Sequence, residues 1–316
     1  MLLFLFIYLF VSFDNLISIY LFTSLWGLIL AFFMPAMLIF ARELFQDDRH
    51  LMYVNSTIDG IFEIGMSLGG LLISFITMHS ILYFLLLFTM IAFLASSKIY
   101  PARIAEKTHD GFIKNWQSIY RYLQHKRFVV YYYFAQIIFT CLFMVVPAFL
   151  APYAKNVLHA TAFEFGIIET SFSIGFIIGT IIIPWFVDKH SSVTVLSWVV
   201  TFSAILYLNL SLLHSVYFAI VCYFFVGSCI SSWAVIVTLA QKHTPLHLQG
   251  KAQGLAYGAS GLLVMGIYSL FFIFNKIHPL PSNQWFYFMI VLALLILIPL
   301  HIGKKKQRQH ADIQNK

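Results

Sequence analysis

Two carboxylate residues stand inside one long apolar stretch of the sequence. Asp59 and Glu63 lie four residues apart within residues 51–78, which are apolar and long enough to cross a membrane. That spacing places both on one helical face, together with Asn55. Helix rise puts Glu63 about 15–18 Å from the helix start, near the middle of a bilayer. Two neighbouring carboxylates in a low dielectric cannot both be ionised cheaply, so we expect one to carry a proton. The alternative is a hydrogen-bonded polar pair without a transport role.

Polar residues in other apolar stretches extend this set of candidates. Glu169 lies about two turns into the expected span 163–187, and we take it as a third proton-coupling candidate. Glu164, at the mouth of that span, is better explained as a solvated residue at a helix start. The polar side chains that we expect to line a cavity are Asn55, Gln136, Ser173, Ser232 and Gln253.

Glycines recur at helical spacing in three of the apolar stretches. Small residues in such stripes let membrane helices approach closely, so we expect helix packing at each. The first stripe lies beside the acidic pair. The three stripes consist of Gly65, Gly69 and Gly70, then Gly175 and Gly179, then Gly250, Gly254 and Gly258 with Gly261 beyond.

The composition requires that lipid be the solvent for most of the chain. Of the 316 residues, 61% are hydrophobic and only 10% are charged, whereas a soluble domain has about 25% charged residues. We therefore predict an all-α polytopic membrane protein with about ten transmembrane helices. The apolar run 1–13 is too short to cross a bilayer, and we expect that it belongs to a helix whose start is missing. The remaining spans are expected near 16–40, 51–78, 80–98, 128–152, 163–187, 193–213, 216–240, 250–274 and 284–302.

Basic residues set the orientation of these spans. Seventeen of the 19 Lys and Arg residues fall on one side of the predicted map, and only Lys155 and Lys276 fall on the other. The side rich in Lys and Arg faces the cytoplasm, which places the C-terminus there. Residues 99–127 contain an amphipathic pattern expected to lie on the membrane surface. The predicted domains are an incomplete N-terminal bundle (1–98), this cytoplasmic linker (99–127), a six-helix C-terminal bundle (128–303) and a basic cytoplasmic tail (304–316).

Several classes of site and ligand are not expected. No basic face interleaves with exposed aromatics, so nucleic-acid binding is not predicted. Cys141, Cys222 and Cys229 have neither metal-ligand nor disulfide spacing. His243 and His247 could share a metal only if a helix ran through Pro245, so we predict no metal and no cofactor. The sequence also has no phosphate-binding Gly-x-x-x-x-Gly-Lys-Ser/Thr motif, so ATP is not the direct energy source.

An intramembrane serine protease is an alternative from a different class. Gly258-Ala259-Ser260-Gly261 matches the Gly-x-Ser-Gly pattern of such enzymes. A serine nucleophile needs a base within hydrogen-bond reach. Ser260 is expected about 15 Å deep by helix rise, whereas His301 lies at the end of its helix. We therefore expect that the protein is not an enzyme.

The topology and several short motifs resemble the major facilitator superfamily. Gly65-Met66-Ser67-Leu68-Gly69-Gly70 looks like the antiporter motif Gly-Pro-x-x-Gly-Gly, with Met66 in place of proline. Trp185-Phe186-Val187-Asp188-Lys189 looks like the loop signature Gly-x-x-x-Asp-Arg/Lys-x-Gly-Arg-Arg, with departures at Pro184, Ser191 and Ser192. Pro35-Ala36, Asn55 and Gln249-Gly250-Lys251 are similar to the exporter branch that contains macrolide-efflux and enterobactin-export proteins.

The resemblance implies a secondary transporter in the cytoplasmic (inner) membrane, in which two helical bundles rock around a central site. We expect proton-coupled export of a small amphipathic molecule by a monomer surrounded by membrane lipid. The alternatives on the same sequence are a lysophospholipid flippase and a truncated or accessory membrane protein without transport activity.

Overall fold

The computed structural model describes residues 33–45, 47–75, 87, 90–91, 94–95, 112–277 and 281–314. These residues are almost entirely helical, as their apolar composition requires, because only a helix satisfies every backbone group within one lipid-embedded segment. The fold is that of an all-α polytopic membrane protein, and six of the described helices are long and apolar enough to span a bilayer. The predicted spans 16–40 and 80–98, and the run 1–13, lie largely or wholly outside the described residues.

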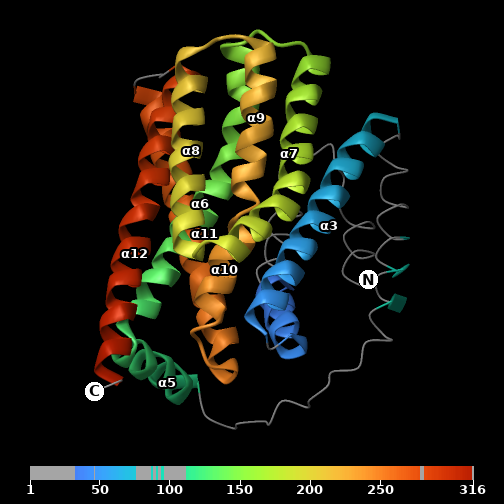
Figure 1. Ribbon diagram of the computed structural model, residues 1–316. Helices are drawn as coiled ribbons and strands as arrows, with labels where there is room; N and C mark the ends of the chain where they lie inside the picture. Colours follow the sequence, from blue (N-terminus) through green and yellow to red (C-terminus); the bar gives the residue numbers. More distant parts are fainter. Residues whose placement is uncertain are drawn as a thin grey trace.

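Seven helices form one bundle, which corresponds to the predicted C-terminal part (Figure 1). Its buried core is rich in aromatic residues such as Tyr132, Tyr153, Tyr207 and Phe286, each less than 2% exposed. Short connections make neighbouring helices antiparallel. The helices are α6 (Arg127–Asn156), α7 (Ala162–Lys189), α8 (Ser192–Leu212), α9 (Val216–Ile230), α10 (Trp233–Gln241), α11 (Leu246–Ile277) and α12 (Trp285–Gln314), with the 3-10 turn η1 (Ser282–Gln284) before α12.

The chain that precedes this bundle is described at α3 (Asp48–Phe75) and at a helical segment over residues 33–44. Helix α3 packs against α7 and α10. Figure 1 shows α3 beside α10 at its first residues and increasingly distant from α7 toward Phe75.

The bundle has two ends that differ in charge. The end with the C-terminus and α5 (Phe112–His125) also holds Arg49, Lys126, Lys242 and Lys304, and we call it the basic end (Figure 1). The connections 157–161 and 213–215 lie at the opposite end. The amphipathic helix predicted within 99–127 is therefore present as α5, whose Ile119 is buried against the bundle.

Two features of the bundle differ from the predicted spans. The span expected at 216–240 is present as Val216–Gln241, but its helix is interrupted, because Ser231 and Ser232 form a turn between α9 and α10. The last span does not end near residue 302, since α12 continues to Gln314 through the segment expected to be a separate tail. A run of helix-forming Lys, Gln and Arg residues explains this continuation.

Candidate functional site

Glu63 lies at the contact between α3 and the large bundle. Its side chain is only 5% exposed, although the neighbouring Ile64 and Met66 are exposed. The Ser173 hydroxyl of α7 donates a 2.6 Å hydrogen bond to Glu63 Oε1. One turn earlier, a Cβ on Gly60 would lie 3.1 Å from Thr180 Oγ1, so the glycine permits this close approach of the two helices. The Glu63 carboxylate therefore bridges α3 and α7 in this structure.

Asp59 is also buried but has different neighbours. It is 7% exposed, and its Oδ2 has no hydrogen-bond partner among the described residues. The carboxylate lies close enough to Tyr257 of α11 for an electrostatic interaction. No hydrogen bond joins Asp59 to Glu63 in the described structure, so the expected close acidic pair is two separate sites on one helix. Each carboxylate therefore faces a different helix of the bundle.

A buried amide network joins α3 to α10 on the basic side of these acids. Asn55 donates from Nδ2 to Thr238 Oγ1 at 2.9 Å and to Gln241 Oε1 at 3.0 Å. Gln241 in turn donates to the carbonyl oxygen of Leu38 at 3.2 Å. Three separate segments of the chain thus meet at Gln241. Sequence reasoning had placed Asn55 in a cavity but had not found its partners.

An exposed group of ion-paired and hydrogen-bonded residues joins α3 to α7 at the basic end. Arg49 donates to Asp188 Oδ2 at 2.8 Å, and the Tyr53 hydroxyl donates to the same oxygen at 2.7 Å. Lys189 does not join this group, because its ammonium lies 3.5 Å above the Trp185 ring. We call Arg49, Tyr53 and Asp188 the latch. The loop signature had indicated Asp188 and Lys189, but nothing in the sequence indicated that Arg49 and Tyr53 would bind the aspartate.

The described side-chain contacts between α3 and α7 lie toward the basic end of these helices. They run from the latch to Glu63 and Ser173. Beyond that point Met66 of α3 is 59% exposed, and Phe163 of α7 is 78% exposed. Glu169, the third proton-coupling candidate, is exposed in the same half of α7. Within the described residues, the two parts are joined at the basic end and diverge toward the opposite end (Figure 1).

The remaining residues predicted to line a cavity, Gln136, Ser232 and Gln253, form hydrogen bonds within the large bundle. Gln136 Nε2 donates to Gln253 Oε1 at 2.7 Å, which links α6 and α11. Gln136 Oε1 and Gln253 Nε2 are buried and have no described partner. Ser232 lies in the turn between α9 and α10 and donates to the carbonyl oxygen of Cys229. Ser232 therefore stabilises a helix break, whereas each of the two glutamines keeps one buried polar atom without a described partner.

The glycine stripes have different roles in the structure. At Gly175 a Cβ would lie 1.8 Å from the carbonyl oxygen of Phe224, and at Gly179 it would lie 2.2 Å from Ser231 Oγ. The close helix packing predicted for this stripe is therefore confirmed, and the partner helix is α9. Gly65 and Gly254 have no described atom within 4 Å of such a Cβ, so their role in packing stays a prediction. Gly69 and Gly70 lie on α3, but their contacts are outside the described side chains.

Neither catalysis nor metal binding is indicated by the described residues. The Ser260 hydroxyl donates to the carbonyl oxygens of Ala256 and Ile137, which accounts for the buried serine without a nucleophilic role. The described residues contain no group of three or more His, Cys, Asp or Glu residues placed to bind a metal. Helix α11 begins at Leu246, so Pro245 does separate His243 from His247 as expected.

Comparisons with known proteins define the family. The sequence model of the Major Facilitator Superfamily matches residues 1–268 and, in an overlapping match, residues 132–312. No curated protein matches the sequence. Among solved structures, the fold is similar to that of the E. coli fucose:proton symporter, with a TM-score of 0.58 and 12% sequence identity. The aligned region covers 85% of this chain and 72% of the symporter. Because the family match covers most of the sequence, the chain belongs to the Major Facilitator Superfamily and is a multi-pass membrane transporter rather than an enzyme.

Proposed function

We propose that this secondary transporter exports a small amphipathic molecule in exchange for protons, with Glu63 as the residue that carries the coupling proton. The observation that supports the proposal is the Glu63–Ser173 hydrogen bond, which joins the two moving parts through a buried carboxylate. In this family the helical bundles rock around a central site. A group whose hydrogen bond depends on that motion links proton binding to it.

Aromatic residues beside Ser173 on α7 and on the neighbouring α6 favour an amphipathic substrate. Phe172 and Phe176 flank Ser173 on α7, and Phe143 of α6 lies against Phe176 with ring centroids 6.2 Å apart. Aromatic walls around a few polar groups bind molecules that have both apolar and polar surface. The free polar atoms of Gln136 and Gln253 could orient such a molecule.

The expected orientation indicates which conformational state of a transport cycle the structure represents. From the distribution of basic residues we infer that the basic end faces the cytoplasm. Contacts from the latch to Glu63 then close the cytoplasmic side, while the outer halves of α3 and α7 diverge. We therefore interpret this arrangement as the outward-facing state, in which an exporter releases its substrate and takes up a proton. Monomeric operation in the inner membrane is part of the same proposal.

Everted membrane vesicles provide the test. With the proton gradient established by respiration, we expect ethidium, an aromatic amphipathic cation, to accumulate in vesicles and to release protons detected by a pH-sensitive dye. Glu63→Gln keeps the shape and hydrogen bonding of the side chain but removes its titration, so it should abolish proton release and leave ethidium binding intact. Glu43→Gln, which removes a carboxylate near the basic end, is the matched control. Full proton coupling in the Glu63→Gln protein would refute the role of Glu63.

A further inference from the structure

A second candidate site lies at the basic end, outside the path between α3 and α7. Arg42, Lys126 and Lys242 line a cavity of about 480 Å³ together with His243 and Thr244. The three cations come from three segments: the helical segment 33–44, the residue before α6, and the connection between α10 and α11. Arg42 also binds Asp48 at 3.0 Å, and the charged side chains among the described residues that line the cavity are all cationic.

His243 adds a neutral polar group to this cavity. Burial lowers the pKa of His243 to about 4, and the adjacent Lys242 and Lys126 lower it in the same direction. Its ring stacks on Tyr132, and its backbone carbonyl accepts a hydrogen bond from the Tyr122 hydroxyl. Nε2 is buried and has no partner among the described residues. A neutral imidazole carries one ring N–H that can donate a hydrogen bond.

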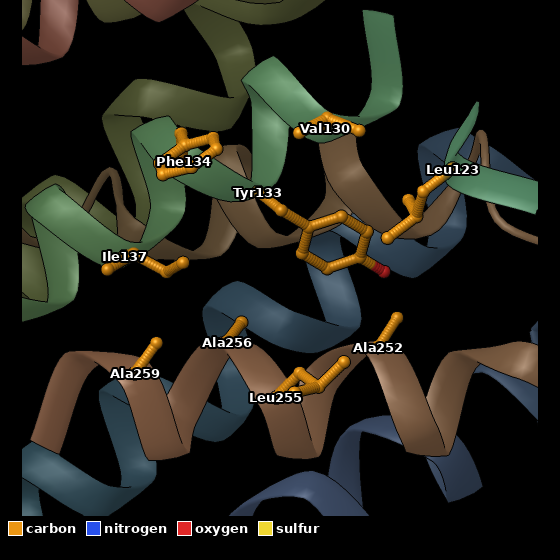
Figure 2. A pocket seen from close by; sticks show the side chains of 9 residues that line it. All are labelled: Leu123, Val130, Tyr133, Phe134, Ile137, Ala252, Leu255, Ala256 and Ala259. Carbon is orange, nitrogen blue, oxygen red and sulfur yellow. The ribbon is translucent and has the colours of Figure 1, made fainter. Parts of the chain in front are cut away.

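An apolar groove adjoins the charged cavity. Figure 2 shows side chains of α6 and α11 facing each other across it, with Leu123 of α5 at one end. Its volume is about 190 Å³, and the exposed Phe134 and Leu255 lie at its opening toward the bilayer. The lining residues are Leu123, Val130, Tyr133, Phe134, Ile137, Ala252, Leu255, Ala256 and Ala259.

The groove and the charged cavity share a wall. Tyr133 lines the groove, and its hydroxyl lies 3.1 Å from Thr244 Oγ1, which lines the cavity. Leu123 at the groove end is followed three residues later by Lys126 in the cavity. A basic pocket next to a lipid-facing apolar groove has the two halves of a phospholipid site: cations for the headgroup phosphate and hydrocarbon for an acyl chain.

We propose that this composite site binds one anionic phospholipid, with its phosphate among Arg42, Lys126 and Lys242 and an acyl chain in the groove between α6 and α11. Charge complementarity selects an anionic headgroup over a zwitterionic one. Because Arg42 precedes α3 whereas both lysines belong to the large bundle, the bound headgroup would connect the two parts at the basic end. The lipid is thus a ligand that favours the closed basic end, and this role does not depend on the transported substrate.

Native mass spectrometry of the full chain in detergent tests the site. Dioleoylphosphatidylglycerol is titrated and compared with dioleoylphosphatidylcholine. Each basic residue near an anionic headgroup contributes roughly fivefold in affinity, so Lys126→Gln with Lys242→Gln should weaken phosphatidylglycerol binding about 25-fold. The matched control removes the exposed Lys155 and Lys305 and should leave binding unchanged. Replacement of both cavity lysines by arginine should retain it.

Two further arms separate the lipid from other ligands. Ala259→Phe fills the groove without a change in charge and should weaken phosphatidylglycerol binding while both lysines remain. Inorganic phosphate at millimolar concentration should not displace the lipid, because it lacks the acyl chain. The proposal would be overturned if phosphatidylcholine bound as tightly as phosphatidylglycerol. It would also be overturned if the control double variant lost as much affinity as the cavity double variant, or if phosphate fully displaced the lipid. A thermal melt of every variant shows that the fold is intact.

Discussion

Gly175→Ala tests the close packing of α7 on α9 at the level of single atoms. The added Cβ would lie 1.8 Å from the Phe224 carbonyl oxygen, which falls 1.6 Å short of an ordinary 3.4 Å contact. The obstacle is backbone, so the helices must separate and the 2.8 Å bond from Ser228 Oγ to the Gly175 carbonyl oxygen weakens. Overpacking of this kind costs about 1–3 kcal/mol. We therefore expect the melting temperature in detergent to fall by roughly 3–10 °C.

The same helix supplies the control for this experiment. A Cβ on Gly166 of α7 would meet no described atom within 4 Å. Gly166→Ala should leave the melting temperature unchanged or raise it slightly, because alanine favours a helix over glycine by about 1 kcal/mol. The melts are followed by the fluorescence of a thiol-reactive dye, since Cys141, Cys222 and Cys229 are buried in the folded protein. Equal melting temperatures for the two variants would refute the close approach of α7 and α9.

Three more predictions follow from the interface and the topology. Asp188→Asn removes the negative charge that Arg49 binds. A cysteine placed at Thr238, deeper in the interface, should then react faster with a thiol reagent than it does when Asp188 is present. An unchanged reaction rate would show that the latch does not hold the basic end closed. A cysteine at Asn156, in intact cells, should react with an impermeant reagent, and one at Gln309 should not; the reverse pattern would invert the proposed orientation. Gln253→Leu removes the 2.7 Å Gln136–Gln253 bond and should weaken ethidium binding severalfold; because buried Gln136 Nε2 then has no acceptor, the stability should also fall by about 1–3 kcal/mol, and unchanged ethidium binding would make the pair purely structural.

The all-helical fold could be predicted from the sequence, because each membrane crossing requires a long run of apolar residues. Apolar length predicted the first five spans of the large bundle to within a few residues, but not the end of the last, because α12 continues to Gln314. Amphipathic spacing, rather than apolar length, predicted α5. The α9–α10 break was missed, since its signal is only a short cluster, Gly227-Ser228 followed by Ser231-Ser232. Such a break depends on tertiary contacts, for example the hydrogen bond from Trp233 Nε1 to Thr140 Oγ1.

The sequence predicted individual residues of the candidate site but not the contacts between them. Helical periodicity placed Asp59 and Glu63 on one buried face, which the structure confirms. The partners could not be derived, because Ser173 is 110 residues away from Glu63 along the chain and pattern analysis carries no information about which helices meet. For the same reason the latch residue Arg49 was counted only as a charge that sets orientation.

The proposed role of Glu63 is tested most directly by distances measured across the interface as a function of pH. Spin labels at Asp47 and His190, on the two sides of the basic end, report its opening by double electron–electron resonance. An ionised carboxylate accepts a stronger hydrogen bond than a neutral one, by about 1 kcal/mol, so protonation of Glu63 should raise the population with the longer distance about fivefold. We expect this population to grow as the pH falls in the wild-type protein and to be high at every pH in Glu63→Gln. A pH response in Glu63→Gln equal to that of the wild type would contradict the account.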